Sequence, residues 1–185
     1  MAGPLTKQQT WVVWGVLFLF MLLFSAANGW LSLTRHNLFN STGFDLAINE
    51  QIVWNTLNGR FFASSVEVDN SFADHFRPML LALVPFYALF QSPKTLLVIQ
   101  TLVLASAAVP VYLLAKFKLE NHAWALIMAA VYLLYPALGF VARFDFHIEI
   151  FVIPALIAAF YMMERGRWNA ASLFLIVPLL SLIHI

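Results

Sequence analysis

The chain has 185 residues, of which 62% are hydrophobic and only 10% are charged, and its mean hydropathy is +0.83. Soluble domains are about 45–50% apolar and about 25% charged, so this composition excludes a disordered chain, argues against a soluble enzyme and indicates a polytopic membrane protein. The net charge of +1 gives no basis for nucleic-acid binding, and the absence of cysteine excludes disulfides and thiolate metal sites.

The first apolar run covers residues 11–33 and follows a single lysine, Lys7. The small residues at 25–27 form a passable signal-peptidase site. The apolar run continues past them, however, and further apolar runs follow. We therefore expect this segment to be a retained transmembrane helix.

The segment 76–91 decides the topology, because its apolar part is shorter than the about 17–25 residues that a span needs and contains Pro85. If this segment does not cross the membrane, the two short basic loops lie on the cytoplasmic side together with Lys7, as the positive-inside rule requires. These loops contain Lys116, Lys118, Arg165 and Arg167. We therefore expect the segment to lie at the membrane interface.

The predicted fold is an all-α domain with a cytoplasmic N-terminus in the plasma membrane. Its five transmembrane helices are expected at about 11–33, 93–115, 122–142, 148–163 and 168–183, with interfacial helices at about 44–58 and 76–91 in the first outer loop. The chain stops inside an apolar run, and residues 180–185 resemble the translation of a sequencing-library adaptor. We therefore expect residues 1–185 to be a single truncated domain, an N-terminal fragment with a short artefactual tail.

This topology places most titratable groups on the outer face, next to apolar helices, where a functional site is expected. Seven of the nine acidic residues fall there: Asp45, Glu50, Glu67, Asp69, Asp74, Asp145 and Glu149. The histidines on that face are His36, His75 and His147. We interpret Arg35, His36 and His122 as interfacial anchors.

The first polar cluster opens the helix expected at 44–58. On a helical period Asp45 and Asn49 lie on a polar edge, whereas Glu50 falls in the apolar stripe, so that either it faces a partner or the assumed phase is wrong. Two interpretations remain open for this cluster. Asp45 is a catalytic candidate, or Thr42 and Asp45 form a capping box at the start of the helix.

The second cluster is Asp74, His75 and Arg77, followed by Pro78. Asp74 and Pro78 are typical of a helix start. The same residues also suit chemistry, because a carboxylate beside an imidazole can bind a divalent ion or share a proton, and an arginine can bind a phosphate.

The third cluster lies in the outer turn before residue 148. If this turn is extended, polar side chains alternate with apolar ones, so that one face is polar. The polar residues are Arg143, Asp145, His147 and Glu149, and the apolar residues are Phe144, Phe146 and Ile148. The alternative interpretation is headgroup contact by flanking charges. The cluster matches no strict metal motif.

Several dispersed motifs occur in an order that resembles the bacterial and archaeal membrane proteins of domain of unknown function 2079. They are Phe44-Asp45-Leu46, then Gln51-x-x-Trp54-Asn55, Asp74-His75-Phe76-x-Pro78, Leu134-Tyr135-Pro136 and Phe144-Asp145-Phe146-His147. That family is in turn similar to the GT-C glycosyltransferases, which take sugars from polyprenyl-phosphate carriers and place an acidic residue early in a long first outer loop.

The resemblance implies a set of roles. Asp45 would be the general base, although Leu46 stands where many GT-C members carry a second acidic residue. The residues implied to bind substrate or phosphate are Arg77, Arg143, Asn49 and Glu50. Those implied to bind a divalent cation, Mg or Mn, are Asp74, His75, Asp145, His147 and Glu149. The alternatives are a transporter or flippase of a lipid-linked substrate, and a non-catalytic membrane assembly protein.

Overall fold

The computed structural model describes residues 6–66, 71 and 77–182, which form helices and, within these ranges, no β-strand. Helix α1, Lys7–Asn37, is long and apolar enough to cross a membrane. Thr6 begins it with a capping box, in which its hydroxyl accepts from the Gln9 N–H and the Gln9 side chain accepts in return. Arg35 lies in its last turn, where a cation faces the negative end of the helix.

The second candidate span consists of α5, Pro93–Ser106, and α6, Ala108–Leu119, which run on from each other through Ala107. Ser92 caps α5, with Pro93 at its first position, as its sequence predicts. The predicted span 122–142 is divided into α7, His122–Leu133, and α8, Pro136–Arg143, which meet at 49°. Pro136 causes the break, because proline donates no N–H and disfavours a helical residue before it.

The last helices are shorter. They are η3, Ile148–Phe151, α9, Val152–Glu164, and α10, Trp168–Leu182. Of the five predicted spans, α1 and α5–α6 thus have the length and composition to cross a membrane, and the bent pair α7–α8 makes a third if it counts as one span. Crossing by α9 and α10 remains a prediction.

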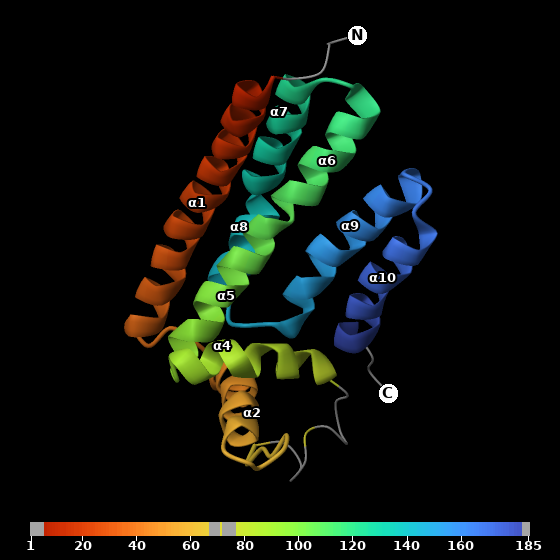
Figure 1. Ribbon diagram of the computed structural model, residues 1–185. Helices are drawn as coiled ribbons and strands as arrows, with labels where there is room; N and C mark the ends of the chain where they lie inside the picture. The colour runs from red at the N-terminus through yellow and green to blue at the C-terminus, as the bar shows by residue number, and fades with distance from the viewer. Residues whose placement is uncertain (1–5, 67–70, 72–76, 183–185) are drawn as a thin grey trace.

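Both helices predicted for the first outer loop are present in the described residues. The first is formed by η1, Gly43–Ala47, and α2, Ile48–Leu57. The second is formed by η2, Pro78–Leu83, and α4, Val84–Leu89, and the start predicted for it at residue 76 lies outside the described residues. In Figure 1, α4 lies across the end of the bundle and α2 extends beyond it.

The polar outer segments gather at one end of the bundle. Figure 1 shows the end of α1, the start of α5, the turn after α8, α2 and α4 there, and we call this the α2–α4 end. The α6–α7 and α9–α10 connections lie toward the opposite end, where the ammonium of Lys118 pairs with the carboxylate of Glu164. The two short basic connections therefore share one end of the bundle, as the predicted topology requires, and which end is cytoplasmic remains a prediction.

Candidate functional site

The best-satisfied polar group at the α2–α4 end is the carboxylate of Asp145, whose residue is only 1% exposed. One oxygen accepts from Arg35 Nη1 at 3.2 Å. The other accepts from the backbone N–H and the hydroxyl of Thr42, at 2.8 and 2.6 Å. Because a buried charge is tolerated only when it is paired and hydrogen-bonded, this arrangement is a structural clamp between three segments of the chain. Arg35, interpreted from the sequence as an interfacial anchor, is the cation of this clamp.

The capping box predicted at residues 42–45 does not form. The Thr42 hydroxyl makes no capping bond to η1, and it donates to Asp145. The contact with Asp145 holds Thr42 in place, because a charged acceptor makes stronger hydrogen bonds than a neutral one. The Asp45 side chain lies near a different partner, described below.

The turn between α8 and η3 also differs from the predicted alternation. Asp145 and Phe146 are both buried, whereas Phe144 is 47% exposed, and a 3-10 helix begins at Ile148. The cause is Gln100, a fully buried residue of α5. Its amide nitrogen lies 3.0 Å from the carbonyl oxygens of Val141 and Phe144 and donates to both, and its side-chain oxygen accepts the N–H of His147 at 3.0 Å.

Gln100 was not among the site residues predicted from the sequence. It is the only amide side chain in the apolar run 93–115, and that is the signal that could have found it, because a buried amide requires partners. By satisfying the turn's backbone groups inside an apolar environment, it determines where Asp145 and His147 lie.

Two residues from separate sequence clusters meet beside this clamp. Nε2 of His147 lies 3.6 Å from Oδ1 of Asp45, and both side chains are 40% exposed. The other ring nitrogen, Nδ1, lies 2.9 Å from the carbonyl oxygen of Asp145. With Nδ1–H donating to that carbonyl, Nε2 is left to accept a proton in the neutral ring or to pair with Asp45 in the charged one. This accessible carboxylate–imidazole pair can hold or move a proton.

Asn49 and Arg77 also meet at this end. The Asn49 amide donates to the carbonyl oxygen of Asp45 at 2.8 Å, and its oxygen accepts from Arg77 Nη1 at 3.4 Å. Asn49 is itself buried. The contact connects the residue before η2 to α2, and it places two of the predicted phosphate-binding residues together.

Glu50 faces a partner, which was one of the two interpretations left open. The hydroxyl of Tyr87, a buried residue of α4, donates to the Glu50 carboxylate. Burial, and then the hydrogen bond and charge of Glu50, raise the pKa of Tyr87 well above its usual range. Glu50 thus joins α2 to α4 within the fold.

Arg143 lies apart from the other candidates. Its Nε donates to the carbonyl oxygen of Gly139 at 2.8 Å, and its guanidinium lies 5.1 Å from the centre of the Phe140 ring, so the side chain folds back along α8. Asp74 and His75, predicted to bind a cation, lie outside the described residues. Within the described ranges, no three His, Cys, Asp or Glu side chains gather closely enough to hold a metal ion.

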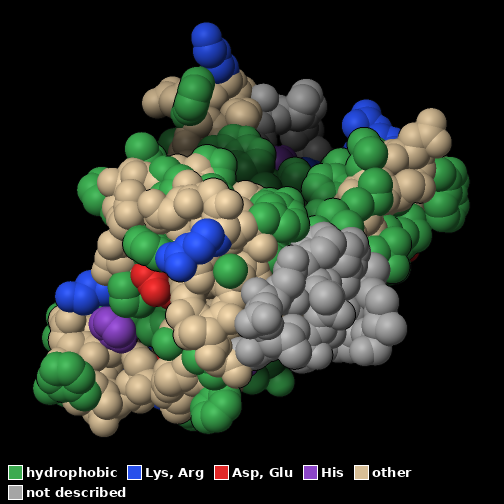
Figure 2. Space-filling view, turned by 90° about the horizontal axis from the view of Figure 1, so that it is seen from below, with side chains coloured by type: hydrophobic (Ala, Val, Ile, Leu, Met, Phe, Trp, Pro, Cys, Tyr) green, Lys and Arg blue, Asp and Glu red, His purple; other side chains and the backbone are tan. Residues whose placement is uncertain are grey.

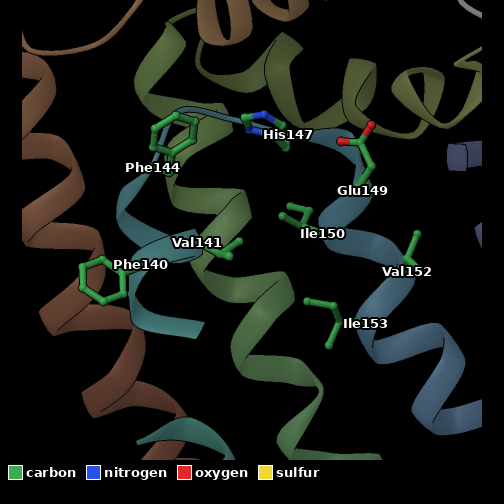
Figure 3. A pocket seen from close by; sticks show the side chains of 8 residues that line it. All are labelled: Phe140, Val141, Phe144, His147, Glu149, Ile150, Val152 and Ile153. Atoms are coloured by element: carbon green, nitrogen blue, oxygen red, sulfur yellow. The ribbon is translucent and has the colours of Figure 1, made fainter. Parts of the chain in front are cut away.

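Glu149 borders an apolar cavity of about 610 Å³. Its walls come from α8, η3 and α9, and Figure 3 shows His147 and Glu149 at the edge near α4, with Phe140 and Ile153 deeper along the helices. Figure 2, which views the same end of the molecule, shows sparse charged side chains of both signs beside hydrophobic ones. The end is therefore an apolar surface with a few localised polar groups.

A family model described as predicted membrane protein, domain of unknown function 2079, matches residues 35–183. The chain belongs to this family. Its membership confirms the resemblance seen in the sequence motifs and establishes an integral membrane protein that contacts the lipid bilayer. The match begins at Arg35 and includes Thr42, Asp45, Asp145 and His147. Comparisons with curated proteins and with solved structures found no match.

Proposed function

We propose that this membrane protein is a glycosyltransferase of GT-C type that takes sugar from a polyprenyl-phosphate carrier at the extracytoplasmic face. The observation that carries the proposal is the accessible pair of Asp45 and His147 at the α2–α4 end. The remaining polar groups there mainly hold the fold, whereas this pair is exposed enough to meet a substrate.

Asp45 acts as the general base in this proposal. Its carboxylate takes the proton of an acceptor hydroxyl while that oxygen bonds to the anomeric carbon, and the polyprenyl phosphate leaves with the electrons of the broken bond. The imidazole of His147, 3.6 Å away, orients the carboxylate. The clamp at Asp145 supports this geometry, because it holds both the segment before η1 and the turn that carries His147.

Arg77 is the proposed contact for the donor phosphate. It lies directly before η2, and Met79 of η2 borders a second apolar cavity of about 470 Å³ between α6, α9 and α10. A polyprenyl chain in that cavity would place its phosphate at the α2–α4 end. Arg143 suits this role less, since its guanidinium lies along α8.

The predicted divalent cation is not used in this step. The two oxygens of Asp145 already accept from Arg35 and Thr42, so this carboxylate does not suit a metal ion. Of the five predicted ligands, His147 and Glu149 alone are both described and accessible. Carboxylate ligands of Mg²⁺ or Mn²⁺ must have oxygens available. We therefore assign neutralisation of the leaving phosphate to arginine.

The membrane arrangement of the proposal is five spans in the plasma membrane with a cytoplasmic N-terminus. The placement of the basic α6–α7 and α9–α10 connections together, at the end opposite the α2–α4 end, supports it. The transporter and assembly alternatives share this arrangement, so only activity distinguishes them.

The test is release of polyprenyl phosphate by the full-length protein in nanodiscs supplied with hexosyl-phosphate polyprenols and membrane lipid acceptors. We expect Asp45→Asn to lower release at least about 100-fold, the usual contribution of a general base, and His147→Ala to lower it as well. Glu120→Gln, at the opposite end, is the matched control and keeps full activity. Wild-type activity in Asp45→Asn would refute the assigned base.

The same preparation separates the alternatives. Movement of intact lipid-linked sugar across proteoliposomes without release of polyprenyl phosphate would identify a flippase. A protein that neither releases nor moves the carrier, and whose cellular role survives Asp45→Asn, would be an assembly protein.

A further inference from the structure

The cavity that Glu149 borders has the polarity profile of a single phospholipid. Phe140, Val141, Ile150 and Ile153 contribute apolar wall, whereas the polar groups His147 and Glu149 stand at the edge (Figure 3). We propose that this cavity binds a membrane phospholipid whose headgroup ends in a primary ammonium, phosphatidylethanolamine, with an acyl chain along the apolar wall. The proposal rests on the cavity and its charges and does not depend on sugar transfer.

The apolar wall suits the acyl chain of a lipid but does not select one lipid over another. The volume of the cavity, about 610 Å³, lies within the range of ligand pockets, about 300–1,000 Å³. Lipid tails in the bilayer are as apolar as the side chains of this wall, so moving a chain into the cavity gains little hydrophobic free energy. Selection among lipids with the same chains must therefore come from the headgroup.

The charges at the edge favour a cationic headgroup. The carboxylate of Glu149 makes no hydrogen bond or ion pair with the described residues, and Asp45 adds a second carboxylate next to His147. No lysine or arginine borders the cavity in the described part of the chain. An ammonium bound here donates to Glu149, whereas a headgroup without a cation forms no ion pair with this carboxylate.

Arg35 provides for the phosphate of the same headgroup. Its guanidinium lies 5.3 Å from the centre of the ring of Phe144, which borders the cavity, and its side chain is 29% exposed. The contacts with Asp145 and with the carbonyl oxygen of Arg143 both use Nη1. Since guanidinium carries five N–H donors, others remain for a phosphate. Arg35 thus supplies a cation beside Phe144, a wall residue of the cavity, and Glu149 supplies a carboxylate at the cavity's edge.

The experiment is native mass spectrometry of the full chain, purified in detergent with equal amounts of phosphatidylethanolamine and phosphatidylglycerol of identical acyl chains. We expect the wild type to retain phosphatidylethanolamine in about tenfold excess, the ratio that a modest difference in binding free energy produces. Glu149→Gln, which keeps the size of the side chain, should bring the two lipids close to equal retention. Ile153→Trp should reduce retention of both, because indole fills the cavity.

Two matched control variants test whether the lipid preference depends on this cavity. Glu120→Gln removes a carboxylate at the opposite end, and Phe160→Trp changes an exposed residue of α9 that does not border the cavity. Both should retain the wild-type preference. Equal retention of the two lipids by the wild type would overturn the proposal, and so would a preference that survives Glu149→Gln. Because Glu149→Gln alters a partly exposed side chain, it keeps the test decisive even if Ile153→Trp does not fold.

Discussion

Thr42 donates both its backbone N–H and its hydroxyl to one carboxylate oxygen of Asp145, which is 103 positions away in the chain. This contact attaches the start of the first outer loop to the turn between α8 and η3. Asp45, three residues after Thr42, thereby comes within 3.6 Å of His147, two residues after Asp145. The candidate pair exists because the clamp beside it holds two distant segments together.

Removing the clamp should destabilise the protein. Asp145→Ala leaves Arg35 partly buried without its carboxylate, and breaking one partner of a buried ion pair costs about 3–5 kcal/mol. We expect a clearly lower Tm by intrinsic fluorescence of the detergent-solubilised protein. Glu120→Ala is the control, since that carboxylate is exposed. Equal melting of the two variants would show that the clamp contributes little.

Replacing Gln100 should loosen the turn more than the helix that carries it. Gln100→Leu keeps the apolar character of α5 but removes the partners of several backbone groups in 141–147, and each unsatisfied buried group costs about 1–3 kcal/mol. Hydrogen exchange should accelerate in 141–147 while α1 stays protected. Leu102→Ala, an exposed position of the same helix, should leave this segment unchanged. Uniform acceleration across all helices would contradict the local role.

The contact of Tyr87 with Glu50 should make stability depend on alkaline pH. The pKa of Tyr87 is raised in the fold, so its contribution is complete below its unfolded value of 10.0 and is lost as pH rises above it. Tyr87→Phe lacks this contribution at neutral pH, where losing a hydrogen bond to a charged group costs about 1.5–3 kcal/mol. The Tm difference between wild type and variant should therefore narrow above about pH 10. A constant difference would show that Tyr87 does not titrate in this way.

The sidedness of the membrane arrangement can be tested directly, because the chain has no cysteine. Asn58→Cys, after α2, should react with an impermeant maleimide in intact cells. Glu120→Cys and Arg167→Cys should react only after permeabilisation, since both lie in connections at the opposite end. The reverse pattern would place the Asp45–His147 pair in the cytoplasm and overturn the proposed location.

Much of the helical framework could be predicted from local sequence. Apolar run length, Pro93 after Ser92, and Pro136 indicate where helices begin or break, because each signal acts within a few residues. The boundaries of the shorter helices depend on packing. Run length alone predicted one straight span over 122–142, whereas Pro136 divides it into α7 and α8, which meet at 49°.

The sequence predicted which residues belong to the candidate site but not their contacts or their burial. Asp45, Asp145 and His147 were recognised as polar groups in an apolar chain, with Asp45 expected as the general base and Asp145 as an accessible cation ligand. Burial separates them, since Asp145 is enclosed by Arg35 and Thr42 while Asp45 stays accessible. The sequence pattern at Thr42 even favoured a local cap, because such a pattern contains no information about a carboxylate far along the chain.

By itself, then, the sequence determined the class of the protein, the positions of its main helices and the separation of its polar clusters from its apolar runs, since hydrophobicity and charge are sums over nearby residues. Only the tertiary structure decided which charges are buried, which pair remains accessible, and which helices enclose the cavity beside Glu149. The reason is physical: a hydrogen bond or a cavity wall depends on which segments meet, and in this chain the segments that build the site are joined by the packing of α1, α5 and α8.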